Sequence, residues 1–249
     1  IIVLDDCSTD RSPEIIAELA ASSPAPIRFV PNETNSGNVF RQWQKGLGLA
    51  RGDYIWIAEA DDLAAPDFLS TVMRGFEAPG VVLSYCESVQ IDGDDNPLAP
   101  DYRYYTDPVA PGKWDANYVN PGKAEIAQAL YLKNTILNAS AVVMRADALR
   151  DVFETHRAEI EGLRFAGDWA VYLNLLARGD IAYSALSRNY HRRHQSSVTI
   201  SNFNQQQLDE IGAMQKKAAR LVPLDSAKQR RASDYLDELR VQFGLKKAG

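Results

Sequence analysis

Three acidic residues follow directly on an apolar run. Residues 54–58 read YIWIA, and Glu59, Asp61 and Asp62 come next. Ionised carboxylates are costly to crowd together or to bury, so a positive group must compensate them. Because residues two apart in a strand point to the same side, Glu59 and Asp61 could face one ligand with Asp62 beside them. Hard oxygen ligands at this spacing suit Mg²⁺ or Mn²⁺. The alternative is a solvated strand-to-helix turn.

A second acidic turn lies at the start of the chain. The apolar residues 1–4 run into the sequence DDCSTD, which begins with Asp5 and Asp6 and contains Ser8. Carboxylates at the end of a strand can accept hydrogen bonds from a nucleobase or a ribose. A turn of small polar residues is the plain alternative. Paired acids also end a strand in phospho-acceptor receiver domains, but such chains have about half this length.

Two further groups of residues could carry chemistry. Asp168 opens an amphipathic helix, where it could act as an N-terminal cap or as a general base beside a cleft. Arg192, Arg193 and His194 stand together in the sequence HRRH. These side chains could contact a diphosphate or a metal ion, or they could be solvated charges of a polar loop.

The elements that must position these residues alternate between strand and helix. The apolar patterns predict strands over residues 1–4, 27–30, 54–58, 81–85, 181–184 and 188–191, a return to the sheet over 138–145, and helices over 12–23, 39–50, 66–76, 146–153 and 168–177. This alternation is typical of an α/β domain with a largely parallel sheet. In such sheets ligands bind beyond the carboxyl ends of the strands, where both acidic turns are expected.

The remaining segments are a long excursion and a helical tail. Residues 97–123 are rich in Pro, Gly, Tyr and Asp, and we expect a surface loop that forms a rim or lid for a substrate. Residues 202–221 and 226–243 are expected to form two helices. We therefore divide the chain into a catalytic domain over 1–200 and C-terminal helices over 201–249.

Composition excludes several classes of protein. The 249 residues carry a net charge of −6, which argues against a nucleic-acid surface. Two cysteines imply no disulfide framework and fit a reducing cytosol. No apolar run is long enough for a transmembrane helix. The expectation is a cytoplasmic location, with peripheral attachment to the inner membrane left open.

Taken together, these motifs resemble the family 2 glycosyltransferases, which have the GT-A fold. The family's V-D-D-G-S-T-D turn resembles residues 4–10, and its N-x-G loop resembles Asn35-Ser36-Gly37. Its A-x-G-x-Y-I and D-x-D-D segments resemble residues 50–55 and 59–62. Its G-D acid resembles Gly167-Asp168, and its Y-R-x-H-x-x-S-x-T tail resembles residues 191–199. The matches follow the family's order over about the first 200 residues.

The resemblance implies an inverting transfer of a sugar from a nucleotide-diphospho-sugar to an acceptor hydroxyl. Residues matching the donor site are Asp5, Asp6, Ser8, Asn35, Gly37, Asp61 and Arg193. A divalent Mn²⁺ or Mg²⁺ ion is expected on Asp61, with Asp62, Glu59 and His194 close by. Asp168 is the expected catalytic base. The implied transferase is of the hexosyl or deoxyhexosyl class, and its acceptor is a glycan, a lipid-linked sugar or a protein, as in bacterial polysaccharide biosynthesis.

The sequence also departs from the family pattern. Glu59 replaces the first acid of D-x-D, Cys7 replaces a glycine, and His191 replaces a tyrosine. The family's first strand, which ends in P-x-Y-N, has no counterpart here. We therefore expect this stretch alone to be poorly stable and inactive, although a longer parent protein should be active. A reversible cooperative melt would contradict that expectation. The alternative function is a non-catalytic sugar-nucleotide or glycan-binding module derived from such an enzyme.

Overall fold

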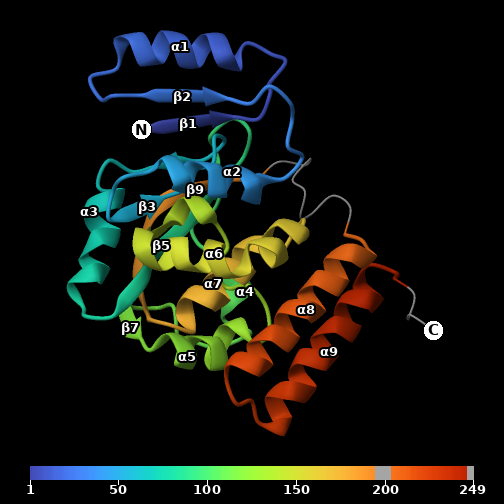
Figure 1. Cartoon of the computed structure of the whole chain (residues 1–249). Helices are drawn as coiled ribbons and strands as arrows, with labels where there is room; N and C mark the ends of the chain where they lie inside the picture. The colour runs from blue at the N-terminus through green and yellow to red at the C-terminus, as the bar shows by residue number, and fades with distance from the viewer. Residues whose placement is uncertain (194–202, 246–249) are drawn as a thin grey trace.

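The structure is a computed structural model that describes residues 1–193 and 203–245. It contains an α/β arrangement in which helices flank two sheets, the larger of them mixed (Figure 1). The strands are β1 Ile2–Asp5, β2 Arg28–Pro31, β3 Tyr54–Trp56, β4 Leu63–Ala64, β5 Val81–Ile91, β6 Pro97–Ala99, β7 Tyr118–Asn120, β8 Val142–Arg145 and β9 Asp180–Arg192. The helices are α1 Ser12–Ser22, α2 Val39–Leu49, α3 Phe68–Met73, α4 Arg103–Thr106, α5 Gly122–Glu125, α6 Ala146–Gly162, α7 Gly167–Leu176, α8 Gln205–Leu221 and α9 Ser226–Gln242.

The strands form two sheets in the described part of the chain. Strands β1 and β2 pair in parallel and carry α1 as a separate layer. The larger sheet has the order β3-β8-β5-β9-β4, with β6 on β5 and β7 on β9. Its long central strands β5 and β9 are parallel, whereas its other described pairs are antiparallel. The sheet is therefore mixed and flanked by helices, as expected, although parallel pairing is less extensive than predicted because hairpin and return strands add antiparallel pairs.

Three predicted elements differ in extent. The strands expected over 181–184 and 188–191 form one strand, β9, which follows β5 through several register shifts. The helix expected over 146–153 continues as α6 to Gly162, with a break at His156. The excursion over 97–123 is not an irregular surface loop, since it holds β6, α4, β7 and the start of α5. It also sends Trp114 into the core, where only 2% of its surface is exposed.

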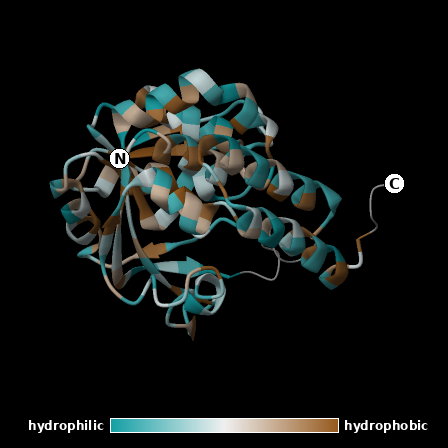
Figure 2. Ribbon diagram, turned by 90° about the horizontal axis from the view of Figure 1, so that it is seen from below, coloured by the Kyte–Doolittle hydropathy of each residue, from teal (hydrophilic) through white to brown (hydrophobic). Residues whose placement is uncertain are grey.

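The two C-terminal helices pack on the rest of the chain. They form an antiparallel pair at one side of the molecule (Figure 1). Met214, Ala218 and Val222 of the α8 region and Ala232 of α9 join the main buried cluster. Figure 2 shows hydrophobic and hydrophilic residues interleaved along the helices, as expected when one face of each helix is buried. No helix of the described residues is long and apolar enough to cross a membrane.

Candidate active site

The acidic turn after β1 is organised by Asp6. Its carboxylate accepts hydrogen bonds from the side chain of Asn32 at 2.5 Å, from Ser36 N and Oγ at 2.8 Å each, and from Gln42 Nε2 at 2.9 Å. Burial disfavours the charge, but the hydrogen bonds from Ser36 and Asn32 outweigh it and hold the pKa of Asp6 below its ordinary value. Asp6 therefore ties the loop after β2 to the end of β1.

The other residues predicted for the donor site lie in the same turn and loop. Asp5 is buried, and its Oδ2 accepts a hydrogen bond from Ser8 N at 3.0 Å. Asn35 Nδ2 donates to the backbone carbonyl of Asp6 at 2.9 Å, and Asn35 Oδ1 accepts from Gly37 N at 2.7 Å. The structure thus brings these five predicted residues together at the carboxyl end of β1.

The cysteine that replaces the family's glycine occupies a left-handed backbone conformation. Cys7 has φ of 67°, a region that residues with a side chain rarely adopt. Its thiol lies 3.6 Å from the carbonyl oxygen of Glu33 in the neighbouring loop. The turn therefore keeps a glycine-like backbone and accommodates the side chain at its exposed edge.

The acids Glu59, Asp61 and Asp62 do not lie on a strand. The backbone N–H of Asp62 bonds to the carbonyl of Glu59 at 3.3 Å, so the segment turns after β3 has ended. Glu59 accepts a hydrogen bond from Trp43 Nε1 at 3.2 Å. Asp62 Oδ1 instead accepts from Arg192 N at 2.9 Å, while Asp61 is exposed. The two-residue strand spacing therefore does not apply, and the three carboxylates have different surroundings.

These surroundings test how well the acids suit a divalent cation. In the residues that the structure describes, no three His, Cys, Asp or Glu side chains are grouped closely enough to hold a metal ion together. His194 lies outside the described residues. Mg²⁺ often binds through one or two carboxylates and takes its other ligands from water and substrate phosphates. Asp61 and Asp62 fit such a partial site, whereas Glu59 is directed to Trp43.

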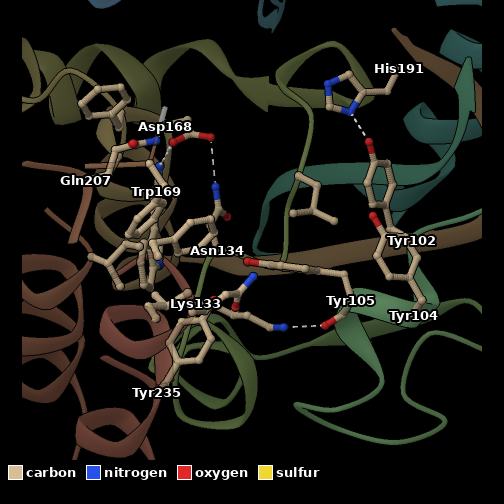
Figure 3. A pocket seen from close by; sticks show the side chains of 18 of the residues that line it. Tyr102, Tyr104, Tyr105, Lys133, Asn134, Asp168, Trp169, His191, Gln207 and Tyr235 are labelled. Carbon is tan, nitrogen blue, oxygen red and sulfur yellow. Dashed lines mark hydrogen bonds between the residues drawn. The ribbon is translucent and has the colours of Figure 1, made fainter. Parts of the chain in front are cut away.

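The environment of Asp168 is suited to a base. Asp168 lies in the first turn of α7, where Oδ1 accepts from Trp169 N at 2.7 Å and Oδ2 from Asn134 Nδ2 at 2.9 Å (Figure 3). Burial raises the pKa of Asp168 to about 7; the two hydrogen bonds oppose this shift, and the charge of Glu59 adds to it. A carboxylate has about four lone-pair positions, so two remain for a substrate proton.

Contacts from two distant segments hold the loop before Asp168. Gly167 packs against the ring of Phe40 in α2 so tightly that a β-carbon would lie 2.3 Å from a ring atom. Glu210 of α8 is buried, and its carboxylate accepts hydrogen bonds from the backbone N–H groups of residues 164, 165 and 166 at 2.7–3.0 Å. These N–H groups precede the first turn of α7. The C-terminal helices therefore help to position the candidate base.

A cavity of about 650 Å³ opens beside Asp168. One wall is formed by the segment 97–123, the start of α7 and the end of β9, and the other wall is formed by α8 and α9. The lining residues include Tyr102, Tyr104, Tyr105, Lys133, Asn134, Trp169, His191, Arg193, Phe203, Gln207, Tyr235 and Phe243. Aromatic rings that flank a few polar groups are typical of a ligand site. Tyr102, Tyr104 and Tyr105 come from the segment 97–123, so this segment contributes to the cavity wall, and its role as a substrate rim stays a prediction.

The tail of β9 brings two polar side chains to the cavity. His191 Nδ1 lies 2.6 Å from the hydroxyl of Tyr102, and burial lowers the pKa of His191 despite the opposing charges of Asp62 and Asp61. Arg193 stands 6.0 Å from the ring centroid of Tyr102. The cavity thus unites Arg193 with Asp168, but the acidic turns after β1 and β3 are outside its lining.

Several lining residues were not singled out by the sequence. Lys133 and Asn134 lie in an apolar stretch without a recognisable motif, and Gln207 and Tyr235 lie on helices whose polar residues look solvated. Their place in the cavity wall depends on how the C-terminal helices pack against the preceding part of the chain. The tyrosine-rich composition of the excursion was the one local signal.

The fold and this arrangement define a glycosyltransferase-like α/β protein, and comparison with known proteins assigns the family. The model of "Glycosyl transferase family 2" matches residues 1–153, and the chain belongs to this family. It is similar to the putative teichuronic acid biosynthesis glycosyltransferase TuaG of Bacillus subtilis, with 26% identity over 188 residues, 74% of this chain and 62% of TuaG. An uncharacterized protein of Mycobacterium tuberculosis is 42% identical over 62 residues, 25% of this chain and 18% of that protein.

Solved structures support the same fold. Residues 1–349 of S. aureus TarS, determined in complex with UDP-GlcNAc, superpose with a TM-score of 0.63 at 16% identity, over 99% of this chain and 66% of that one. The GT-A-like fold expected from the sequence is thus confirmed. The chain spans less than two thirds of the length of the curated relatives described above.

Proposed function

We propose that this protein transfers a sugar from a nucleotide-diphospho-sugar to an acceptor hydroxyl with inversion at the anomeric carbon. The observation that carries the proposal is Asp168, a carboxylate with a pKa near neutrality on the wall of the large cavity. A general base works best when its pKa is close to the working pH. Family membership and the UDP-GlcNAc complex of TarS support a sugar-nucleotide donor, and a UDP-sugar is the first donor to test.

In the proposed reaction, ionised Asp168 accepts the proton of the acceptor hydroxyl. The hydroxyl oxygen forms a bond to the anomeric carbon while the bond from that carbon to the diphosphate breaks. Asn134 and the N–H of Trp169 keep the carboxylate oriented. Arg193 offers a positive charge to the departing nucleoside diphosphate.

The donor is proposed to lie along the turn after β1 and the acids after β3. Asp5 and Ser8 offer polar groups to the nucleoside, and Asp6, Asn35 and Gly37 shape the loop beside them. Asp61, with Asp62, would hold a Mn²⁺ or Mg²⁺ ion that neutralises charge on the donor diphosphate. His194 remains a proposed member of this site.

The proposal extends to the class of product and acceptor. The similarity to TuaG supports a role in building a bacterial glycan or polysaccharide. The transferred sugar is proposed to be a hexose or a deoxyhexose. A glycan, a lipid-linked sugar or a protein could carry the acceptor hydroxyl. The second candidate is a module that binds sugar nucleotides or glycans without catalysis, which the same cavity would serve.

Calorimetry of the full-length protein with UDP, GDP and dTDP, with and without Mn²⁺, tests the donor site. Metal-dependent binding of one nucleotide that is lost in Asp61→Ala is the expected result. Binding that ignores both the metal and the substitution would remove Asp61 from the site. Turnover of the corresponding sugar nucleotide, by transfer or by slow hydrolysis, separates the enzyme from the non-catalytic module.

A further inference from the structure

Within the described residues, the cavity beside Asp168 contains a buried cation without a counter-ion. Lys133 is 8% exposed and lines the cavity. Its Nζ donates to the backbone carbonyl of Tyr105 at 2.6 Å and lies 3.5 Å from the centroid of that tyrosine ring (Figure 3). The ring of Tyr235 from α9 is 5.7 Å from the same nitrogen. Among the described residues, no carboxylate lies within ion-pair distance of Nζ.

Two other partly buried lysines of this chain are paired with carboxylates, whereas Lys45 and Lys228 have no ion-pair partner among the described residues. Lys113 Nζ lies 2.8 Å from Glu125, and Lys217 Nζ lies 2.8 Å from Glu159. An ammonium group has three N–H donors, and burying it without an opposite charge is costly. A carbonyl and an aromatic face compensate Lys133 only in part. Lys133 therefore resembles half of an ion pair whose other half would arrive with a ligand.

The charges around Lys133 are consistent with this view. Burial lowers the pKa of Lys133 to about 8, the positive charge of Arg231 adds to this shift, and Glu238 opposes it. Arg231 and Glu238 bond to each other at 2.9 Å on α9, so they largely cancel. Lys133 stays mostly charged at neutral pH. An anion placed beside it would restore its full charge.

The position of Lys133 links it to the candidate base. Its sequence neighbour Asn134 donates to Asp168, so one short segment presents both the group that orients the base and the ammonium group of Lys133. The rings of Tyr105, Tyr235 and Trp169 stand along the same cavity. Aromatic faces can pack against the apolar faces of sugar rings. The cavity thus offers a stacking surface with a positive group set apart from the base.

We propose that the acceptor carries an anionic group, a carboxylate or a phosphate, which binds to Lys133 while its reacting hydroxyl lies at Asp168. The inference rests on the proposed function and specifies its acceptor class. Uronic acids and sugar or polyol phosphates share this chemistry. A neutral acceptor would leave the Lys133 ammonium group uncompensated.

Matched pairs of small probes test the charge requirement on the full-length protein. A disaccharide ending in glucuronic acid is compared with the one ending in glucose, and glycerol 1-phosphate is compared with glycerol, by saturation-transfer NMR titration. We expect the charged member of at least one pair to bind about 10-fold more tightly, a typical contribution of a hydrogen-bonded charge pair. The pair that shows the difference identifies the carboxylate or the phosphate.

The preference must depend on Lys133. Lys133→Met should abolish it, whereas Lys123→Met, which removes the same charge from an exposed position on α5, should leave it unchanged. Equal binding of charged and neutral probes to the wild type, including no binding of either, would overturn the inference, as would an undiminished preference in Lys133→Met.

A measurement on the wild type covers the case in which the Lys133 variant does not fold. The preference should decline between about pH 7.5 and about pH 9.5 as Lys133 loses its proton. Burial raises the pKa of both Tyr105 and Tyr235 above its ordinary value. Arg231 and Glu238 of α9 also face Lys133. From pH 7.5 upward Asp168 is mostly ionised and His191 is mostly neutral, because the pKa of Asp168 is about 7 and burial lowers the pKa of His191. A preference that is constant over this interval would contradict the assignment to Lys133.

UDP-sugar turnover in the same preparations separates the two hypotheses. Turnover without any Lys133-dependent preference would leave the transferase function intact and remove only the anionic acceptor. Lys133-dependent anion binding without turnover of any sugar nucleotide would keep the anion site and remove the transferase function.

Discussion

Asp6 and Asp168 are two aspartates of one domain in opposite environments. Asp6 accepts four hydrogen bonds from three surrounding residues, and those from Ser36 and Asn32 lower its pKa. Asp168 has two such bonds in a more enclosed setting, and burial raises its pKa to about 7. The protein therefore satisfies the first carboxylate and leaves the second partly unsatisfied. A partly unsatisfied carboxylate is the one able to take a proton, which is why perturbed groups mark candidate sites.

The largest expected effect comes from removing the proposed base. Asp168→Asn should lower the rate of transfer by about 1,000-fold, because general-base catalysis contributes on this scale. Nucleotide binding measured by calorimetry should stay unchanged. Wild-type transfer should also rise with pH up to about 7, since only the ionised form of Asp168 accepts the proton.

Asp147 provides a matched control for that substitution. It is the second residue of α6, as Asp168 is of α7, and its Oδ1 accepts from the next backbone N–H at the same 2.7 Å. Asp147 is exposed and lies outside the cavity lining. Asp147→Asn should retain wild-type activity. An Asp168→Asn enzyme that also retained it would eliminate the proposed mechanism.

The contrast between Asp6 and Asp168 also shows what the sequence could predict. Adjacent acids after an apolar run placed Asp5 and Asp6 at the end of β1, and the G-D motif placed Asp168 at the start of α7. These are local features that depend on strand and helix patterns. The hydrogen bonds to Asp6 and the burial of Asp168 depend on contacts between distant segments, so the sequence could not distinguish their roles.

The same reasoning explains the errors in the predicted elements. The single strand β9 was divided at residues 185–187, where the structure has an irregularity: pairing with β5 passes from Ser184 to Ser187 with a register shift and then continues. The segment around Glu59 was taken as a strand because residues 54–58 are apolar, yet pairing with β8 ends at Trp56. The cavity wall formed by α8 and α9 required the tertiary packing. Tertiary contacts, rather than local propensity, decided these features.

Replacing Asp6 by asparagine and replacing Asp168 by asparagine should change the stability of the protein in opposite directions. Asp6 is more acidic in the folded state, so its contribution to stability is present above about pH 4 and is lost as the pH falls through its folded pKa. Asp6→Asn should therefore destabilise the protein at pH 7, by about 1–3 kcal/mol, because an amide cannot accept all four hydrogen bonds.

Asp168 should behave in the reverse way. Its folded pKa is raised, so holding it ionised costs stability, and this cost grows as the pH rises from about 4 to about 7. Asp168→Asn should raise the melting temperature at pH 8, by about 2–4 °C for each kcal/mol recovered, and should give little gain at pH 4. Thermal melts at the two pH values check both substitutions. A change of melting temperature in the same direction for both substitutions at pH 8 would contradict the contrast between the two sites.

The smallest expected effect concerns the electrostatic interaction between Glu59 and Asp168. The charge of Glu59 contributes to the raised pKa of Asp168, although burial is the larger cause. Glu59→Gln keeps an acceptor for Trp43 Nε1 and removes the charge. The acid limb of the rate–pH profile should shift to lower pH by less than about one unit, with little change in the plateau rate. If Glu59 instead binds the catalytic metal ion, the plateau rate and the affinity for Mn²⁺ should fall together, and the limb should stay in place. The profile therefore decides whether Glu59 acts with the base or with the metal.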